Sequence, residues 1–153
     1  MEQPEKTQLL KEEWLQIQTH VENFDRIFVE VKKWSVTVSL AIVVGAFASE
    51  KMWPILIGGI SALGFWLVET WMRAYQQSYW PRNAAIERYF TGKGQQIAPL
   101  QMGAEWSKAF EKNCKWRSIL KISLYPETSL PHMFIALIAA AFFALLKFEI
   151  ISF

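Results

Sequence analysis

Glu69 is the one ionisable side chain that lies well inside a long apolar stretch, so it is the first residue to consider for chemistry. Sixteen uncharged residues precede it from Trp53 on, and three more separate it from Arg73. A charge inside a spanning helix costs about 2.5 to 3.5 kcal/mol on insertion scales, and such residues often serve ion pathways. Arg73 follows at i+4, in the order that favours a pair on one helix face. Two interpretations stay open: an interfacial ion pair that positions the helix, and a role in ion passage or gating.

The other reactive residue types do not form the constellation of an enzyme. His20 and His132 lie in separate predicted elements, and a single cysteine, Cys114, allows neither an intramolecular disulfide nor a cysteine-based zinc site. Its basic neighbours in KNCKWR leave Cys114 either a thiol of lowered pKa or an incidental surface thiol. The sequence contains no HExxH, GxGxxG, GxSxG or Walker motif. We therefore expect no enzymatic activity, no cofactor and no metal.

The composition indicates an integral membrane protein with room for one domain. The chain has 153 residues, of which 52% are hydrophobic and 15% aromatic, and its net charge is +2. It is too apolar for a disordered chain, and it carries no general basic excess that would indicate nucleic acid. The N-terminus is acidic and polar, unlike a cleaved signal peptide, so the first spanning helix would act as its own insertion signal.

Three apolar runs predict an all-α membrane fold. The run 53–73 is long enough to cross a hydrocarbon core of about 30 Å, and the charge-free run 34–48 precedes it across a short link, which predicts a transmembrane hairpin over 34–73. A third run from His132 predicts a span within 132–153, although its length also fits a partly inserted helix. Small residues four apart would let these helices pack closely; they are Ala41 and Gly45, Gly58 and Ala62, and Ala136, Ala140 and Ala144.

Residues 1–33 predict a cytoplasmic amphipathic helix that continues into the first span. Apolar residues recur there at alternating spacings of 4 and 3 over three heptads. The helix could cover another part of the same chain, or it could form a coiled-coil seam between copies. We expect one helix from about Lys6 to Ala48. The heptad positions are Leu10, Trp14, Ile17, Val21, Phe24, Phe28 and Val31.

Residues 74–131 predict a cytoplasmic helical region. Pro81 marks a kink or a new helix start, and 91–103 is loop-like because it holds three glycines and a proline. A helix is expected from Ala104 to about Leu124, ended by the segment 125–131. Its face with Lys108, Lys112 and Lys115 suits a membrane surface as readily as a partner protein.

The basic residues predict the orientation of the chain. With the N-terminus in the cytoplasm, fourteen of the sixteen lysines and arginines lie inside or at the inner interface, and only Lys51 and Lys147 lie outside. We therefore expect a multi-pass protein of the inner (plasma) membrane with an extracytoplasmic C-terminus.

Two segments together resemble the SLATT class of membrane effectors. The first, KKWSVTVSLAIVVGAF, supplies Lys32, Trp34, Ser35 and Thr37, and the second, GFWLVETWMRAYQQSYWPR, supplies Phe65, Trp66 and Glu69. The resemblance covers roughly residues 10 to 90. SLATT-like proteins commonly have two spans, whereas three are predicted for this chain. The resemblance implies a role in bacterial antiviral systems by pore formation or membrane perturbation, and it implies no catalytic residue.

The sequence thus favours a homo-oligomeric membrane protein that forms a pore or otherwise compromises the bilayer. The lipid bilayer and further copies of the chain are its expected partners, with no nucleic acid. The alternative is a non-conducting membrane anchor or regulatory subunit that recruits a cytoplasmic protein.

Overall fold

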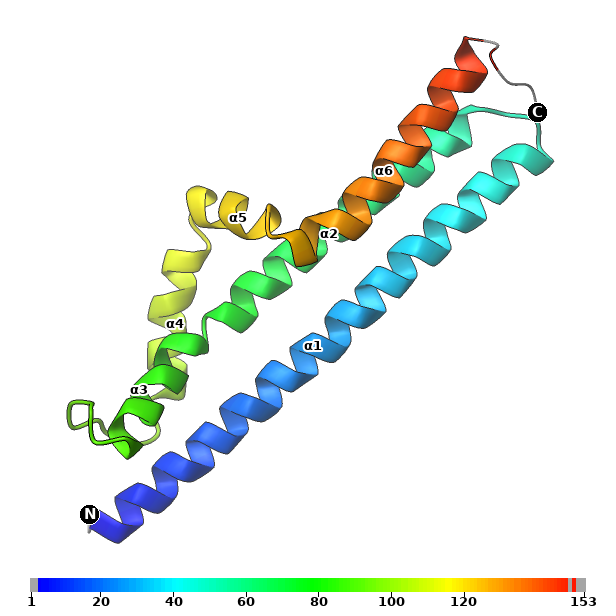
Figure 1. Ribbon diagram of the computed structural model, residues 1–153. Helices are drawn as coiled ribbons and strands as arrows, with labels where there is room; N and C mark the ends of the chain where they lie inside the picture. Colours follow the sequence, from blue (N-terminus) through cyan, green and yellow to red (C-terminus); the bar gives the residue numbers. More distant parts are fainter. Residues whose placement is uncertain (1–2, 149, 151–153) are drawn as a thin grey trace. The chain divides into compact units, whose positions relative to one another are not determined.

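The computed structural model describes residues 3–148 and 150 (Figure 1). Helices make up 84% of the described residues, and no strand occurs among them, so the predicted all-α class is confirmed. The helices are α1 (Gln3–Ala48), α2 (Trp53–Gln77), α3 (Trp80–Phe90), α4 (Met102–Asn113), α5 (Trp116–Ser123) and α6 (Pro126–Lys147). They form two compact units: unit 1 comprises 1–26 and 71–120, and unit 2 comprises 27–70 and 121–153.

Two stretches contain a helix that is long and apolar enough to cross a membrane. One is Trp53–Phe90, which begins with α2, and the other is α6. The apolar end of α1, which has only fifteen residues without a charge from Trp34 on, is not among them in the described part of the chain, and its predicted crossing stays a prediction. The last part of the predicted third span, residues 149 and 151–153, lies outside the described residues.

The heptad positions of α1 in unit 1 pack against other residues of the same chain. Leu10 and Ile17 are fully buried and form one core cluster with Ile86 of α3, around which Trp14 and Val21 pack. Side chains with no exposed surface cannot also form a seam with another copy. For Leu10 and Ile17 the structure shows the helix covering another part of the same chain, and the coiled-coil seam between copies stays a prediction for the heptad positions that keep exposed surface. Phe24 and Val31 are half-buried, and Phe28 is buried.

A buried ion pair joins α1 to α3 in unit 1. The guanidinium of Arg82 donates from Nε to Glu13 Oε1 at 2.9 Å and from Nη2 to Glu13 Oε2 at 2.7 Å. Nη2 also donates to the Ala98 carbonyl at 2.7 Å, and the Leu100 amide donates to Glu13 Oε2 at 3.0 Å. Leu100 has φ +60°, a left-handed conformation that is costly outside glycine. The pair thus anchors a loop that would not hold this shape alone.

Aromatic contacts hold α4 in unit 1. Trp106 and Phe110, one turn apart, stack with ring centroids 4.8 Å apart, and Tyr75 lies 4.3 Å from Phe110. The Trp106 indole donates to the Tyr75 carbonyl at 3.2 Å. This face explains why α4 forms despite its polar composition, since helical stability in proteins comes mainly from packing.

The prediction of one helix from Ala104 to about Leu124 is wrong, because the chain turns between α4 and α5. The Asn113 amide donates to Ser78 Oγ at 3.0 Å, and Ser118 Oγ donates to the Lys112 carbonyl at 3.1 Å, a polar side chain competing with the helical ladder. The three lysines of the predicted basic helix are therefore divided. Lys108 and Lys112 lie on α4, Lys115 lies in the turn, and all three are exposed.

The predicted break at 125–131 is also wrong in extent. Helix α6 begins at Pro126, where a proline suits the first turn, and it continues through Pro131. The Ser129 hydroxyl donates to the Tyr125 carbonyl at 3.1 Å. By contrast, the new helix start expected near Pro81 is confirmed, since α3 begins at Trp80.

Replacement of Glu13 should destabilise unit 1 strongly. Glu13→Gln leaves the buried Arg82 charge without its carboxylate, which we expect to cost about 3 to 5 kcal/mol of unfolding free energy. The measurement is chemical unfolding of the full chain in detergent, followed by helical circular dichroism. Glu12→Gln is the matched control, because Glu12 is exposed next to Glu13. Equal stability of the two variants would contradict the assignment.

Candidate functional site

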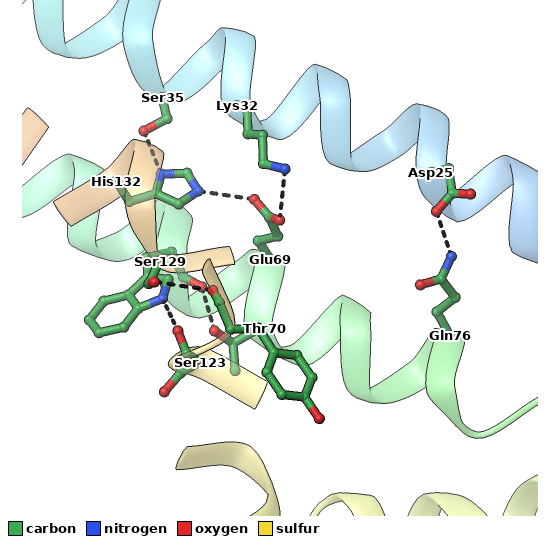
Figure 2. Close-up of polar contacts among 11 residues, drawn as sticks. Asp25, Lys32, Ser35, Glu69, Thr70, Gln76, Ser123, Ser129 and His132 are labelled. Carbon is green, nitrogen blue, oxygen red and sulfur yellow. Dashed lines mark hydrogen bonds and ion pairs between the residues drawn. The ribbon is translucent and has the colours of Figure 1, made fainter. Parts of the chain in front are cut away.

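The candidate site is a buried polar cluster in unit 2 formed by Lys32, Ser35, Glu69 and His132 (Figure 2). The Glu69 side chain has no exposed surface, and its two oxygens have different partners. Lys32 Nζ lies 3.3 Å from Oε1, and His132 Nε2 lies 3.1 Å from Oε2. We call these four residues the polar cluster.

Both nitrogens of the His132 ring are engaged. Nδ1 lies 2.8 Å from the Ser35 hydroxyl, while Nε2 faces the Glu69 carboxylate. The ring is fully buried. A neutral imidazole can therefore donate to the carboxylate through Nε2–H and accept from the serine at Nδ1, so every polar atom of the ring is satisfied.

Helical spacing delivers these residues to one place. Lys32, Ser35 and Ser39 follow one another at intervals of three and four on α1, so they lie on one face. Glu69 comes from α2 and His132 from α6. One turn along α1, Ser39 Oγ donates to the Gly58 carbonyl at 3.1 Å and lies 3.4 Å from Ser61 Oγ.

Small residues allow these helices to approach closely. A Cβ at Gly58 would lie 3.4 Å from the Ser39 carbonyl oxygen, and one at Gly59 would lie 3.1 Å from the Ala139 Cβ. Gly58 and Ala62, two of the predicted packing residues, are buried. Ala41, Gly45 and Ala140 are exposed, and a Cβ at Gly45 would meet open space. Ala136 and Ala144 are half-buried.

Trp66 fixes the beginning of α6 against α2. Its indole donates to the Ser123 carbonyl at 2.9 Å, next to the turn between α5 and α6. Thr128, one turn before His132 on α6, is fully buried, and its hydroxyl has no hydrogen-bond partner among the described residues. The cluster thus borders a polar atom that the protein itself leaves unsatisfied.

An apolar cluster fills the opposite end of unit 2, near the turn between α1 and α2. It consists of Ala46, Ile55, Ala139 and Leu146, with Met52 and Phe143 packed against it. Ala46 lies eleven positions after Ser35 on α1, which is about 16 Å along the helix. Unit 2 is therefore polar inside at one end and apolar inside at the other.

The predicted pair of Glu69 with Arg73 stays a prediction, whereas the contacts with Lys32 and His132 were not predicted. One signal in the sequence points to them. Lys32 and Ser35 stand where the first apolar run begins, Glu69 stands near the end of the second, and His132 opens the third. In helices that alternate in direction these positions come to the same level, so the three polar groups are brought together.

The remaining reactive residues lie outside the cluster. Burial raises the pKa of the Cys114 thiol, which favours the unreactive protonated form over the lowered pKa considered above. His20 stacks on Tyr79 with centroids 5.4 Å apart, and burial raises the pKa of the Tyr79 phenol. No group of histidine, cysteine and carboxylate side chains able to hold a metal ion occurs among the described residues.

Comparison with known proteins adds no relative. No protein-family model matches the chain, and no significant match is found among curated proteins or solved structures.

Glu69 and His132 should prove energetically coupled. In a double-mutant cycle with Glu69→Gln and His132→Gln, we expect a coupling energy of about 1 to 3 kcal/mol. Each single change deprives the other buried side chain of the hydrogen bond between them. The measurement is unfolding in mixed micelles. A parallel cycle of Glu69→Gln with Lys33→Gln should give about zero, since Lys33 pairs with Glu30 instead. Coupling near zero in both cycles would argue against the contact.

Proposed function

We propose that the protein is a multi-pass inner-membrane protein that works as a homo-oligomer and permeabilises the bilayer, with the polar cluster as its conducting or gating element. The observation that carries this proposal is the complete burial of Glu69 between Lys32 and His132, within helices whose outer surfaces are apolar. An ionisable group in such surroundings is costly and typically marks an ion or proton path.

The distribution of side chains in unit 2 supports a bilayer environment. Its buried side chains include many polar ones, whereas its exposed side chains include many large apolar ones. This is the reverse of a soluble protein, in which buried polar side chains are the exception. The exposed apolar residues include Trp34, Leu40, Val44, Trp53, Ile57, Ile60, Leu67, Phe134 and Leu137.

Assembly is proposed through α1 at membrane depth. Because Leu10 and Ile17 have no exposed surface and the other heptad positions of unit 1 are half-buried, we place the contact between copies elsewhere on the chain. Ala41 and Gly45 lie four apart and exposed, beside the exposed Leu40 and Val44. Such small-residue faces allow close helix contact in lipid. The resemblance to SLATT effectors makes bacterial antiviral defence the setting in which we propose that permeabilisation acts.

A non-conducting anchor or regulatory subunit is the second candidate. Unit 1 favours it through large exposed apolar side chains: Trp80 is 61% exposed, and Leu100 and Trp116 are each 73% exposed. Such side chains outside the apolar runs suit a cytoplasmic protein partner.

The proposed topology places the two ends of α1 on opposite sides of the membrane. In a Cys114→Ser background, Gln8→Cys should be protected from a membrane-impermeant maleimide in intact cells, whereas Glu50→Cys should react. Both replaced residues are exposed. The basic residues of 1–33 and 74–131 support this direction, because such residues are retained inside. Labelling of both positions from the same side would overturn the three-span topology.

Permeabilisation should depend on the Glu69 carboxylate. Purified protein in liposomes should collapse a potassium diffusion potential, and Glu69→Gln should change the rate at least about tenfold, which corresponds to about 1.4 kcal/mol in a barrier. Glu50→Gln, an identical change at an exposed turn residue, should behave as wild type.

The two candidates separate in the same preparation. An anchor would leave the diffusion potential intact and would bind a soluble protein through unit 1. Silence of wild type in liposomes, together with such binding that Trp116→Ala abolishes, would replace the permeabilising function with the anchor.

A further inference from the structure

We propose that Glu69 and His132 form a proton-binding site in which Lys32 and the protonated ring compete for one carboxylate. The inference rests on the proposed function for its membrane setting, and it names the proton as the ligand of that site. It is carried by the geometry of the polar cluster, where one buried carboxylate faces a lysine ammonium and an imidazole through separate oxygens.

The hydrogen bond between His132 and Ser35 can form both when the ring is neutral and when it is protonated. In the neutral ring, Nε2–H donates to Glu69 Oε2, and Nδ1 accepts from the Ser35 hydroxyl 2.8 Å away. When a proton arrives at Nδ1, the new N–H donates to Ser35 Oγ. The serine hydroxyl then turns to another acceptor, and a serine within a helix has the carbonyl of residue i−4 in reach. No other hydrogen bond of the ring has to change.

The charge of the cluster explains why Lys32 must respond. With a neutral ring, the Glu69 carboxylate already faces the full positive charge of Lys32. A proton on His132 adds a positive charge to a buried site, where an unbalanced charge is strongly disfavoured. The side chain of Lys32 is 28% exposed, whereas the side chains of Glu69 and His132 have no exposed surface. Lys32 can therefore move its ammonium to the membrane interface and leave the Glu69 carboxylate to the imidazolium.

The two ends of unit 2 differ in their access to water. Lys32, whose side chain is 28% exposed, lies on the side from which we expect a proton to arrive, while the apolar cluster of Ala46, Ile55, Ala139 and Leu146 fills the other end. Protonation of His132 with release of Lys32 therefore gives two arrangements of α1, α2 and α6 that differ in charge placement. A two-state element of this kind can be shifted by pH.

Other charged or titratable groups stand on the elements that carry the ring and its partners. From α2, Arg73 lies one turn beyond Glu69 and is predicted from its spacing to reach the same carboxylate. On α6 itself Glu127 is exposed, the Lys121 side chain of α5 is exposed, and Tyr125 in the turn is half-buried. Among the contacts of the ring, Glu69 is the titratable partner and Ser35 the neutral one.

The experiment observes the ring directly. The chain has two histidines, so His20→Gln leaves His132 as the single imidazole. With ¹⁵N-histidine in liposomes, solid-state NMR distinguishes the neutral tautomers from the imidazolium. We expect the neutral Nε2–H form at pH 8 and the imidazolium at pH 5, within the range where histidine normally changes charge. A ring that keeps one form throughout would overturn the proposal.

Lys32 and Lys33 provide a matched pair of variants. Lys32→Gln removes the competing cation, so the midpoint of the His132 titration should move to higher pH by about one unit or more. Lys33→Gln removes the same charge from an exposed neighbour that pairs with Glu30, and it should move the midpoint much less. Equal shifts would refute the competition. If Lys32→Gln does not fold, as judged by helical circular dichroism, the titration in the His20→Gln background alone decides.

Failure of this proposal is distinguishable from failure of the proposed function. Proton uptake is measured on the ring and requires no conduction. Liposome leakage that is equal at pH 5 and pH 8, with a ring that never charges, would refute the proton site and leave permeabilisation intact. A ring that titrates as expected in liposomes that never leak would refute permeabilisation and leave the proton site intact.

Discussion

The burial of the Glu69 carboxylate is the constraint on which unit 2 depends. A negative charge without exposed surface is tolerated only when partners replace the water it has lost. Lys32 supplies a full charge from α1, and His132 supplies a hydrogen bond from α6. Removal of any one of these helices would leave a charge or a ring nitrogen unsatisfied. The carboxylate therefore specifies which helices meet and at which level.

Close packing of the helices brings short polar side chains within hydrogen-bonding distance of the neighbouring helix. Serine hydroxyls reach across helices only where backbones approach, and Gly58 and Gly59 provide that approach against Ser39 and Ala139. At the other end the same helices meet through alanine and larger aliphatic side chains without polar atoms. In lipid, where apolar burial gives no preference between protein and hydrocarbon, such packing and the interhelical hydrogen bonds hold helices together.

Periodicity and apolar runs predicted much of the fold. The long helix α1, the start of α2 and the new helix at Pro81 follow from repeats and breakers that act locally. Two local interpretations failed where neighbouring segments decide. The turn between α4 and α5 coincides with the hydrogen bond from Asn113 to Ser78, a contact across 35 positions of the sequence, and α6 continues through Pro131.

The site was predictable only in part, because its contacts also join segments that are distant in the sequence. Glu69 stands out in the sequence because charge is rare in apolar runs. Its partners are separated from it by more than thirty residues on either side, and nothing local distinguishes His132 from an interfacial histidine. Likewise, the heptad repeat in α1 did not predict whether Leu10 and Ile17 pack against Ile86 of the same chain or against another copy. Packing within the chain and packing between copies require the same apolar pattern.

Two carboxylates are buried among the described residues, Glu13 and Glu69, and they differ in a way that bears on function. Glu13 receives two bonds from one Arg82 guanidinium and a third from the Leu100 amide, so a rigid fork matches both of its oxygens. Glu69 divides its oxygens between a flexible ammonium and an imidazole. Arginine keeps its charge at all relevant pH values, whereas histidine does not. Glu13 is thus held by a partner of constant charge, while the partners of Glu69 include a histidine, a residue type whose charge can change.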